Sequence, residues 1–314
     1  MSARFVVDEN SLDLDGVSAS LARAMILAFL DLVEELQADH GVCFDDELMS
    51  RPLLGNKTFW ELFNEDAGLD LSRDDLERAS IAFGPMQRWY ELDDTELSIT
   101  EVSVDGNTAE TSGSIAWAHA QASRKGGVVA CICAPHTRRT GVCKVVLKES
   151  ARNVWFVSNP VEVEGFFRWV IAQYADRADQ IEALAPAAFR KLRFVDGCFG
   201  GIGQMSKPCR QLAPVIVHHL SAFSDHGERI FSPEDRSQVT AEFGALGVEI
   251  TDENGKTKRN SRAAQQRIRF FEGENYYFWW HSKLERNVDR IHICPIIRGE
   301  GILLVVGIFC RHLD

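Results

Sequence analysis

The chain has 314 residues, of which 45% are hydrophobic and 25% are charged, and this is enough for two ordinary domains or one large one. There is no run of eighteen apolar residues, and the opening "MSARFVVDEN" leads straight into charge, so we expect neither a membrane span nor a signal peptide. Most of the eight cysteines lie in apolar surroundings, which is typical of buried thiols in a reducing compartment. We therefore expect a soluble cytoplasmic protein.

The net charge of −12 is unevenly distributed along the chain. Residues 1–110 hold 7 basic and 25 acidic residues, a net charge of −18, and the rest of the chain carries +6. A chain with one acidic and one mildly basic part can still present a cationic surface to a nucleic acid. The acidic part could equally keep the protein soluble or bind a basic partner.

The first part of the chain alternates strand and helix patterns. Short apolar runs predict strands, and longer stretches with apolar residues at helical spacing predict helices. This alternation is typical of an α/β domain built on a largely parallel sheet, here expected over residues 1–183. In chain order, the main expected elements are a strand at 4–12, a helix at 18–41, a short strand or turn at 42–49, helices at 70–89 and 114–127, strands at 128–134, 139–149 and 153–159, and a helix at 163–185.

The pattern changes in the second part, which we expect to form an α+β domain over residues 184–314. Two helices are predicted at 208–223 and 232–247, and from residue 247 the chain has strand and turn patterns only. The expected fold is a pair of helices packed on a twisted antiparallel sheet.

Three C-terminal segments carry imidazole and cationic side chains: "WWHSKL", "DRIHICP" and "ILLVVGIFCRHL". Residues two apart in a strand point to the same face, so pairing of these strands could gather the side chains on one open sheet face. Imidazoles move protons near neutral pH, and cations stabilise charge that builds on a phosphate, so such a face suits metal-independent RNA cleavage. The candidate catalytic residues are His281, Lys283, Arg290, His292, Arg311 and His312.

A basic run, "GKTKRNSRAAQQRIR", precedes these segments. Such a run can bind phosphates, and the neighbouring Tyr and Trp residues could stack on unpaired bases, although a solvated hairpin without a ligand would have the same composition. The candidate nucleic-acid-binding residues are Lys256, Lys258, Arg259, Arg262 and Arg267.

The order of helices and then strands, with "HSKL", "DRIHI" and "ILLVVGIFCRHL", resembles the RelE/HigB class of ribonuclease toxins over about residues 205–314. The resemblance implies phosphate or transition-state roles for the lysine and the two arginines named above. It implies proton transfer by one of the three histidines and leaves open which. It also suggests a bacterial anti-phage or conflict-system protein.

The N-terminal part is similar to PIN-type nuclease domains, in which carboxylates bind Mg²⁺ or Mn²⁺ at strand ends. In "FVVDENSL", Asp8 or Glu9 matches the first acid, and "VCFDDELMS" supplies the second, with Asp46 as our choice there. The later segment "VVACICAPHTRR" departs from the pattern, because it ends in Pro135 and basic residues where another Asp is expected. This departure favours a PIN-like domain without nuclease chemistry.

A zinc site is a further alternative, because four possible ligands fall within thirteen residues. Cys131 and Cys133 belong to a predicted buried strand, however, and their spacing is not the usual C-x₂-C pair. The four residues are Cys131, Cys133, His136 and Cys143.

Three functions remain open at this point. The first is a defence or toxin-type effector that binds and cleaves RNA without a metal, with the acidic domain regulating it or recruiting partners. The second is a non-catalytic nucleic-acid-binding or scaffolding subunit of a multi-protein anti-phage complex. The third is a PIN-type nuclease that requires Mg²⁺ or Mn²⁺. RNA and other subunits of a defence operon are the expected partners, and no membrane is expected.

Overall fold

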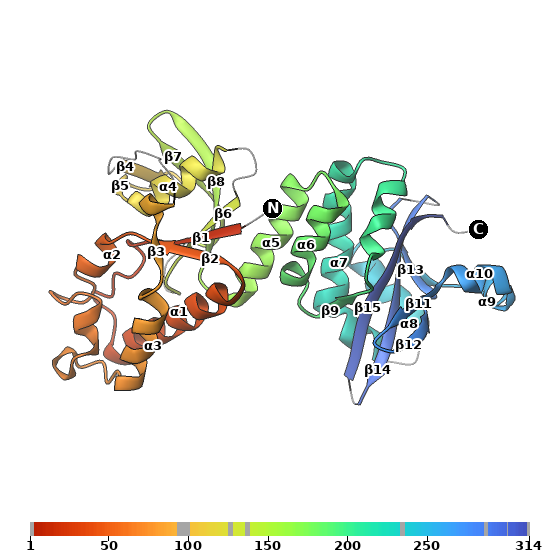
Figure 1. Cartoon of the computed structure of the whole chain (residues 1–314), viewed down its shortest axis with the longest axis horizontal. Helices are drawn as coiled ribbons and strands as arrows, with labels where there is room; N and C mark the ends of the chain where they lie inside the picture. Colours follow the sequence, from red (N-terminus) through yellow and green to blue (C-terminus); the bar gives the residue numbers. More distant parts are fainter. Residues whose placement is uncertain are drawn as a thin grey trace. The chain divides into compact units, whose positions relative to one another are not determined.

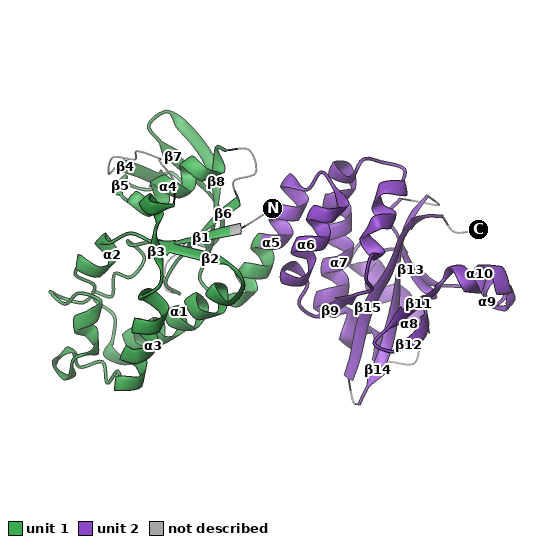
Figure 2. Cartoon of the chain, viewed as in Figure 1, with its two compact units in different colours: residues 1–166 green, residues 167–314 purple. Residues whose placement is uncertain are grey.

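The computed structural model describes residues 3–92, 101–124, 128–135, 139–232, 236–285, 288–299 and 301–312. The chain divides into two compact units, unit 1 (residues 1–166) and unit 2 (residues 167–314; Figure 2). The division falls inside helix α5 (Pro160–Tyr174), ahead of the boundary after residue 183 that the sequence pattern suggests. The two parts of this helix have different partners: the Phe166 ring packs edge-on against Phe5 of unit 1, whereas Arg168 forms an ion pair with Asp225 of unit 2.

Unit 1 is built on an eight-stranded, mostly parallel sheet with the order β3-β2-β1-β6-β8-β7-β4-β5 (Figure 1). The first five strands in this order are parallel, and the last three pair antiparallel. The strands are β1 (Ala3–Val7), β2 (Gly41–Phe44), β3 (Gln87–Arg88), β4 (Glu101–Val104), β5 (Glu110–Thr111), β6 (Val128–Ile132), β7 (Gly141–Leu147) and β8 (Ser150–Val157).

Helices cover both faces of this sheet, as the alternation along strand β1 requires. Phe5 packs on Phe166 of α5, and the next residue, Val6, packs in the cluster that contains Ile115 and Trp117 of helix α4. The expected short strand or turn at 42–49 is confirmed as far as Phe44, where the strand ends, and a short helix follows it. The helices of unit 1 besides α5 are α1 (Ala19–Asp39), α2 (Glu47–Ser50), α3 (Arg73–Phe83) and α4 (Gly113–Ala122), with 3-10 turns at Trp60–Phe63, Glu65–Ala67 and Trp89–Glu91.

Unit 2 contains a separate five-stranded sheet with the order β10-β13-β14-β15-β9. The predicted antiparallel pairing of the three C-terminal segments is confirmed, because β13, β14 and β15 are consecutive antiparallel neighbours; β9 joins the edge in parallel. A two-stranded ribbon, β11 with β12, lies outside this sheet. The strands are β9 (Leu192–Phe194), β10 (Ile250–Asp252), β11 (Ile268–Phe271), β12 (Glu274–Tyr277), β13 (Trp280–Lys283), β14 (Asp289–Arg298) and β15 (Gly301–Arg311).

Helix α7 (Cys209–Phe231) packs on one face of this sheet. Its Gly227 lies against the Leu304 side chain, and its His219 Nδ1 lies 3.0 Å from the Ser282 hydroxyl. The predicted helix over 163–185 is in fact two helices, because the chain breaks after Tyr174 and restarts where the Gln180 side chain accepts backbone N–H groups. Unit 2 also contains α6 (Ala178–Ala188), the 3-10 helix η4 (Cys198–Gln204) and α8 (Arg236–Ala245).

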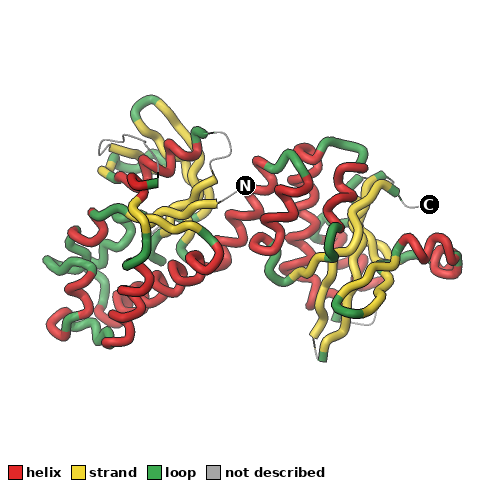
Figure 3. The backbone as a smooth tube through the Cα atoms, viewed as in Figure 1, coloured by secondary structure: helices red, strands yellow, loops and turns green. Residues whose placement is uncertain are grey.

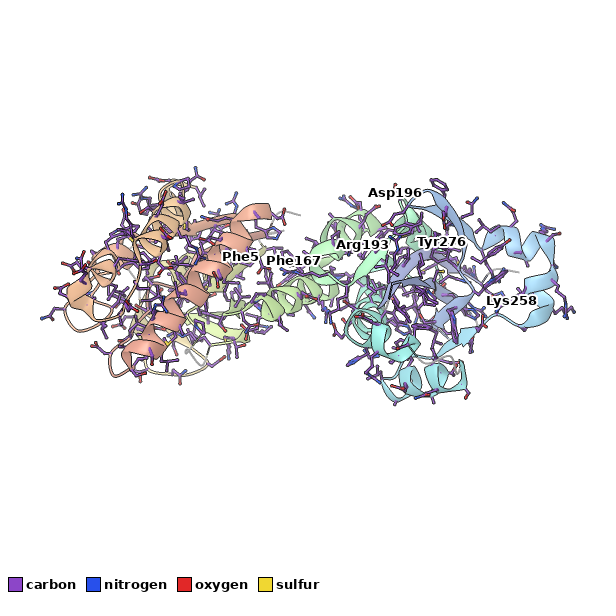
Figure 4. All side chains as sticks on the ribbon, turned by 90° about the horizontal axis from the view of Figure 1, so that it is seen from below. Phe5, Phe167, Arg193, Asp196, Lys258 and Tyr276 are labelled. Atoms are coloured by element: carbon purple, nitrogen blue, oxygen red, sulfur yellow. The ribbon has the colours of Figure 1, made fainter. Side chains whose placement is uncertain are left out.

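The basic run forms two short helices, α9 (Gly255–Arg259) and α10 (Ser261–Gln266), where the sequence pattern predicted strands and turns (Figure 3). The Asn254 side chain accepts the Thr257 N–H, and the Asn260 side chain accepts the N–H groups of Arg262 and Ala263. These N-caps explain why helices this short form. Figure 4 labels Lys258 on α9 and Tyr276 on β12.

All eight cysteines are free thiols. None of the described helices combines the length and the apolar character needed to cross a membrane.

Candidate functional site

The pairing of β13 with β14 brings four predicted residues onto one sheet face. His281 lies opposite His292, and Lys283 lies opposite Arg290. Directly opposed residues of an antiparallel pair project to the same side, so the two imidazoles and two cations share one face. We refer to this side as the histidine face.

Arg311 does not belong to the histidine face. It lies opposite Asp289, whereas Arg290, the next residue along β14, lies opposite Cys310. Because side chains alternate along a strand, Arg311 and Asp289 project to the other side of the sheet. The Asp289 carboxylate accepts the backbone N–H of Ser206 at 3.0 Å. The expectation that Arg311 joins the cluster is therefore wrong.

A pocket of about 510 Å³ opens over the histidine face. Its walls come from strands β10, β13 and β14, from the end of β15, and from helices α9 and α10, which Figure 1 shows beside this sheet. The acidic residues in the wall are Asp252 and Glu253. The basic and imidazole residues in the wall are Lys256, Arg267, His281, Lys283, Arg290 and His312.

Arg290 is a buried cation in this wall without a direct carboxylate partner among the described residues. Its side chain is 8% exposed, and among the described residues no carboxylate forms an ion pair with it. One terminal nitrogen (Nη1) lies 3.1 Å from His281 Nε2, and its buried Nε atom has no hydrogen-bond partner. Burial lowers the pKa of Arg290, against the opposing effect of the nearby Glu253 carboxylate.

His281 faces Arg290 through one ring nitrogen and Glu253 through the other. An arginine N–H can only donate, so Nε2 accepts and the ring proton lies on Nδ1. The Thr251 hydroxyl lies 3.1 Å from Nε2, and Nδ1 lies 3.6 Å from Glu253 Oε1, without a hydrogen-bond partner. Burial and the neighbouring Arg290 lower the pKa of His281 to about 4, so this imidazole is neutral at neutral pH.

His292 is sealed from solvent, with no exposed surface. Its Nδ1 lies 3.0 Å from the Phe278 carbonyl oxygen and donates to it, which leaves the lone pair on Nε2. This Nε2 is buried without a partner, and the ring centroid lies 5.1 Å from that of His281. Burial holds the pKa of His292 well below its usual range. Of the two imidazoles on the face that was predicted to be open, His281 lines the pocket and His292 has no contact with solvent.

The predicted phosphate-binding residues are in different environments. Arg267 is 2% exposed and donates to Glu253 at 2.8 Å and to the Ala263 carbonyl at 2.9 Å, so it supports the wall of the pocket. Lys258 pairs with Asp252 at 2.7 Å and lies over the Trp279 ring. The other three, Lys256, Arg259 and Arg262, are exposed, and of these Lys256 lines the pocket.

Sequence reasoning missed Glu253 and Thr251, which bracket His281. Both belong to "EITDEN", in which β10 ends at Asp252 and Asn254 caps helix α9. An acid directly before an N-cap was the available signal, although nothing in the sequence shows that β10 pairs with β13.

In unit 1, Asp8 directly follows strand β1. The strand order reverses at β1, because β2 and β3 lie on one side of it and β6 and the later strands lie on the other. Ligands of open α/β sheets commonly bind at this point. Here, however, Arg139 donates to the fully buried Asp8 carboxylate at 2.6 Å and also pairs with Glu110. Burial raises the pKa of Asp8, against the opposing effect of Arg139.

The other acids of unit 1 have separate partners. Asp46 accepts the Tyr90 hydroxyl at 2.5 Å and Arg88 at 3.1 Å, and these bonds lower its pKa. Glu9 accepts the Ser114 N–H at the start of α4; burial, and then Asp8, raise its pKa to about 7. Within the described ranges, Asp8 and Asp46 do not join any group of three metal-ligating side chains.

The zinc alternative can be followed at three of its four positions, because His136 lies outside the described residues. Cys131 and Cys133 are fully buried, and burial raises the pKa of both thiols well above the usual value. The group of metal-ligating side chains that the described residues do form is Glu253, His281 and His292, whose ligand atoms all lie within 4.8 Å of one another.

Comparison of the chain with protein-family models, curated proteins and solved structures found no match.

Proposed function

We propose that this protein is a bacterial defence or toxin-type effector that binds RNA in the pocket of unit 2 and cleaves it there. The observation that carries the proposal is Arg290, a buried guanidinium in the pocket wall without a carboxylate partner among the described residues. A buried cation that the protein does not compensate is costly, and an anion from outside removes that cost. Phosphate matches the planar donor pattern of arginine.

The surroundings favour a nucleic acid over a free anion. Lys256 and His312 share the pocket with Arg290, and a volume of about 510 Å³ is in the range of ordinary ligand pockets. The Trp279 carbonyl accepts the Glu253 N–H, so this residue lies beside the pocket wall. Its ring stacks on Tyr277 at 4.9 Å, and Tyr277 is 46% exposed. An exposed aromatic next to a phosphate site offers stacking to an unpaired base.

The cleavage step that suits these residues is transfer within the RNA. The 2′-hydroxyl attacks the adjacent phosphorus and loses its proton to His281 Nε2, while Arg290 stabilises the charge on the phosphoryl oxygens. The bond to the 5′-oxygen breaks, and that oxygen takes a proton from His312. The products are a 2′,3′-cyclic phosphate and a 5′-hydroxyl, and no electrons are exchanged with a cofactor.

The topology is compatible with both resemblances. In unit 2, helices α7 and α8 precede the antiparallel strands β13, β14 and β15, as in the RelE-like fold. In unit 1, the order β3-β2-β1-β6-β8 with an acid after β1 fits a PIN-like fold, and the Asp8–Arg139 pair fits a version without nuclease chemistry. Unit 1 has 14 basic and 28 acidic residues, and we propose that it recruits a basic partner or another subunit of a defence operon.

The test is binding and cleavage of a labelled single-stranded RNA at low salt by the full chain and by Arg290→Gln. We expect at least a tenfold loss of affinity and loss of cleavage. Arg298→Gln is the matched control, because Arg298 lies on the same strand, is exposed and pairs with Glu272 outside the pocket. Equal losses in the two variants would show that only net charge matters and would remove the site.

A binding subunit without catalysis is the second candidate. Two observations favour it: His292 is sealed from solvent, and the Asp8 carboxylate is already paired with Arg139. In each nuclease-like site, one expected catalytic residue is thus not available to a substrate. Affinity that depends on Arg290, without any cleavage, would identify this function.

A further inference from the structure

We infer that Glu253, His281 and His292 form a binding site for a divalent transition-metal ion such as Zn²⁺, with Glu253 and His281 in the wall of the pocket. This inference goes beyond the proposed function, because it concerns binding of the ion whether or not RNA is the ligand. Two imidazoles and one carboxylate are a donor set that Zn²⁺ and its neighbours prefer. The hard cation Mg²⁺ prefers oxygen ligands, so the set discriminates against it.

The distances are close to those of a coordinated ion. All three ligand atoms lie within 4.8 Å of one another, and His281 Nδ1 is 3.6 Å from Glu253 Oε1. Ligand atoms around a tetrahedral zinc ion lie about 3.4 Å apart, given bond lengths near 2.0 to 2.1 Å. Small movements of the three side chains would therefore bring their ligand atoms to coordination distance of one ion.

The orphaned nitrogen atoms point to a missing ligand. His281 and His292 are 4% and 0% exposed, and the buried atoms without a hydrogen-bond partner are Nδ1 of the first and Nε2 of the second. Buried polar atoms are nearly always satisfied, so two adjacent orphans call for an explanation. An ion supplies one: it takes the lone pair of His292 Nε2 and, once the His281 proton has moved to Nε2, that of His281 Nδ1.

The surrounding contacts orient the ligands as in known metal sites. His292 donates its Nδ1–H to the Phe278 carbonyl, which fixes the ring and presents the Nε2 lone pair. Arg267 Nε holds Glu253 Oε1 at 2.8 Å, and the Thr251 hydroxyl lies 3.1 Å from His281 Nε2. The nearby guanidinium groups of Arg267 and Arg290 oppose a cation, so we expect weaker binding than at a structural zinc site.

The ion would also change the hydrogen bonding of His281. Nδ1 can bind a metal only when the ring proton is on Nε2, and Nε2 then donates to Thr251 and no longer accepts from Arg290. The guanidinium group is thereby freed for a phosphate, and this consequence rests on the proposed function. Three protein ligands also leave a position for water or a phosphate oxygen. Proton transfer to Nε2 belongs to the ion-free protein, so cleavage that requires the ion would have to proceed by another route.

The experiment is titration of the chelator-treated full chain with Co²⁺, followed by its visible absorption, and with Zn²⁺ in competition with a coloured chelator. We expect one ion per chain and a rise in the melting temperature with Zn²⁺. Glu253→Gln and His292→Gln should each lower the affinity at least tenfold and abolish the rise. His312→Gln, which changes an imidazole in the same pocket outside the ligand set, should leave both unchanged.

Circular dichroism is used to select folded variants, because His292 is fully buried. If His292→Gln does not fold, Glu253→Gln and His281→Gln decide. Absence of Co²⁺ binding by the native chain, or equal binding by all folded variants, would overturn the site. The titration contains no RNA, so its failure leaves the Arg290 test of RNA binding intact.

Discussion

Each unit has a buried charged side chain at its sheet, and the two differ in whether an opposite charge pairs with them. In unit 1, the buried Asp8 carboxylate has its own cation, Arg139, which also pairs with Glu110. In unit 2, Arg290 is 8% exposed, faces a pocket, and has a neutral imidazole as its hydrogen-bond partner. Charges that the chain cancels internally support the fold, whereas a cation left uncancelled beside a cavity is available to an outside anion. This difference supports a structural role for Arg139 and is the basis of the proposal that Arg290 binds a ligand.

The largest expected difference is in stability. Arg139→Met leaves Asp8 buried without its cation, and breaking a buried pair in this way costs about 3 to 5 kcal/mol. Arg290→Met removes a buried cation that has no direct carboxylate partner among the described residues, so we expect the free energy of unfolding to stay constant or rise. Urea unfolding followed by hydrogen exchange reports on each unit separately and provides the measurement.

Arg88→Met is the control for the first substitution, since the Arg88–Asp46 pair is solvent-exposed and its loss should change stability little. A loss of stability in Arg290→Met as large as that in Arg139→Met would mean that both arginines are structural, and the contrast between the units would fail.

The next effect is a pH dependence confined to unit 1. The pKa of Glu9 is about 7 in the folded protein, against an ordinary value of 4.5, because burial and the neighbouring Asp8 disfavour its ionised form. The folded state thus holds this proton more tightly than the unfolded state. The free energy of unfolding should fall as pH rises from 4.5 to 7, by up to about 3 kcal/mol from this group.

Urea midpoints of the native chain and of Glu9→Gln at pH 5 and pH 8 test this dependence. The substitution should flatten the difference between the two pH values. Glu61→Gln is the control: hydrogen bonds from Thr58 lower the pKa of Glu61, so its contribution is lost only as pH falls below 4.5, outside the tested window. An unchanged pH dependence in Glu9→Gln would show that the carboxyl is ionised in the fold.

The sequence predicted the shared face of unit 2 and could not predict how much of it is open. The two-residue alternation along each strand is enough to place His281 with Lys283 and Arg290 with His292. His292 is fully buried, and its ring N–H is bound by the carbonyl of Phe278, which follows β12 and precedes β13 in the chain. Alternation shows which side chains share a face and carries no information on what covers that face.

Two further discrepancies have local causes. The register between β14 and β15 shifts between His292 and Ile293. The sheet face to which Arg311 and His312 point therefore cannot be found by counting residues from the turn between the two strands. Helices α9 and α10 have five and six residues, too few for a periodic apolar pattern, and their asparagine caps were the available signal. In unit 1, the acid after β1 was predicted, but its partner Arg139 is 131 residues away along the chain.

The smallest predicted effect concerns a cation that is only partly cancelled. Lys283 lines the pocket of unit 2 and pairs with Glu249, which is 56% exposed. Glu249→Gln removes this competitor, so Lys283 becomes available to a second phosphate, and RNA should bind about two- to threefold more tightly at low salt. The same substitution at Glu110, which pairs with Arg139 in unit 1, should not change RNA affinity. Fluorescence anisotropy at two salt concentrations provides the measurement, and the gain should shrink at the higher one because salt screens the added contact. Equal gains at Glu249 and Glu110 would mean that RNA responds to the overall charge of the chain, and the distinction between a compensated and an open cation would then not account for binding.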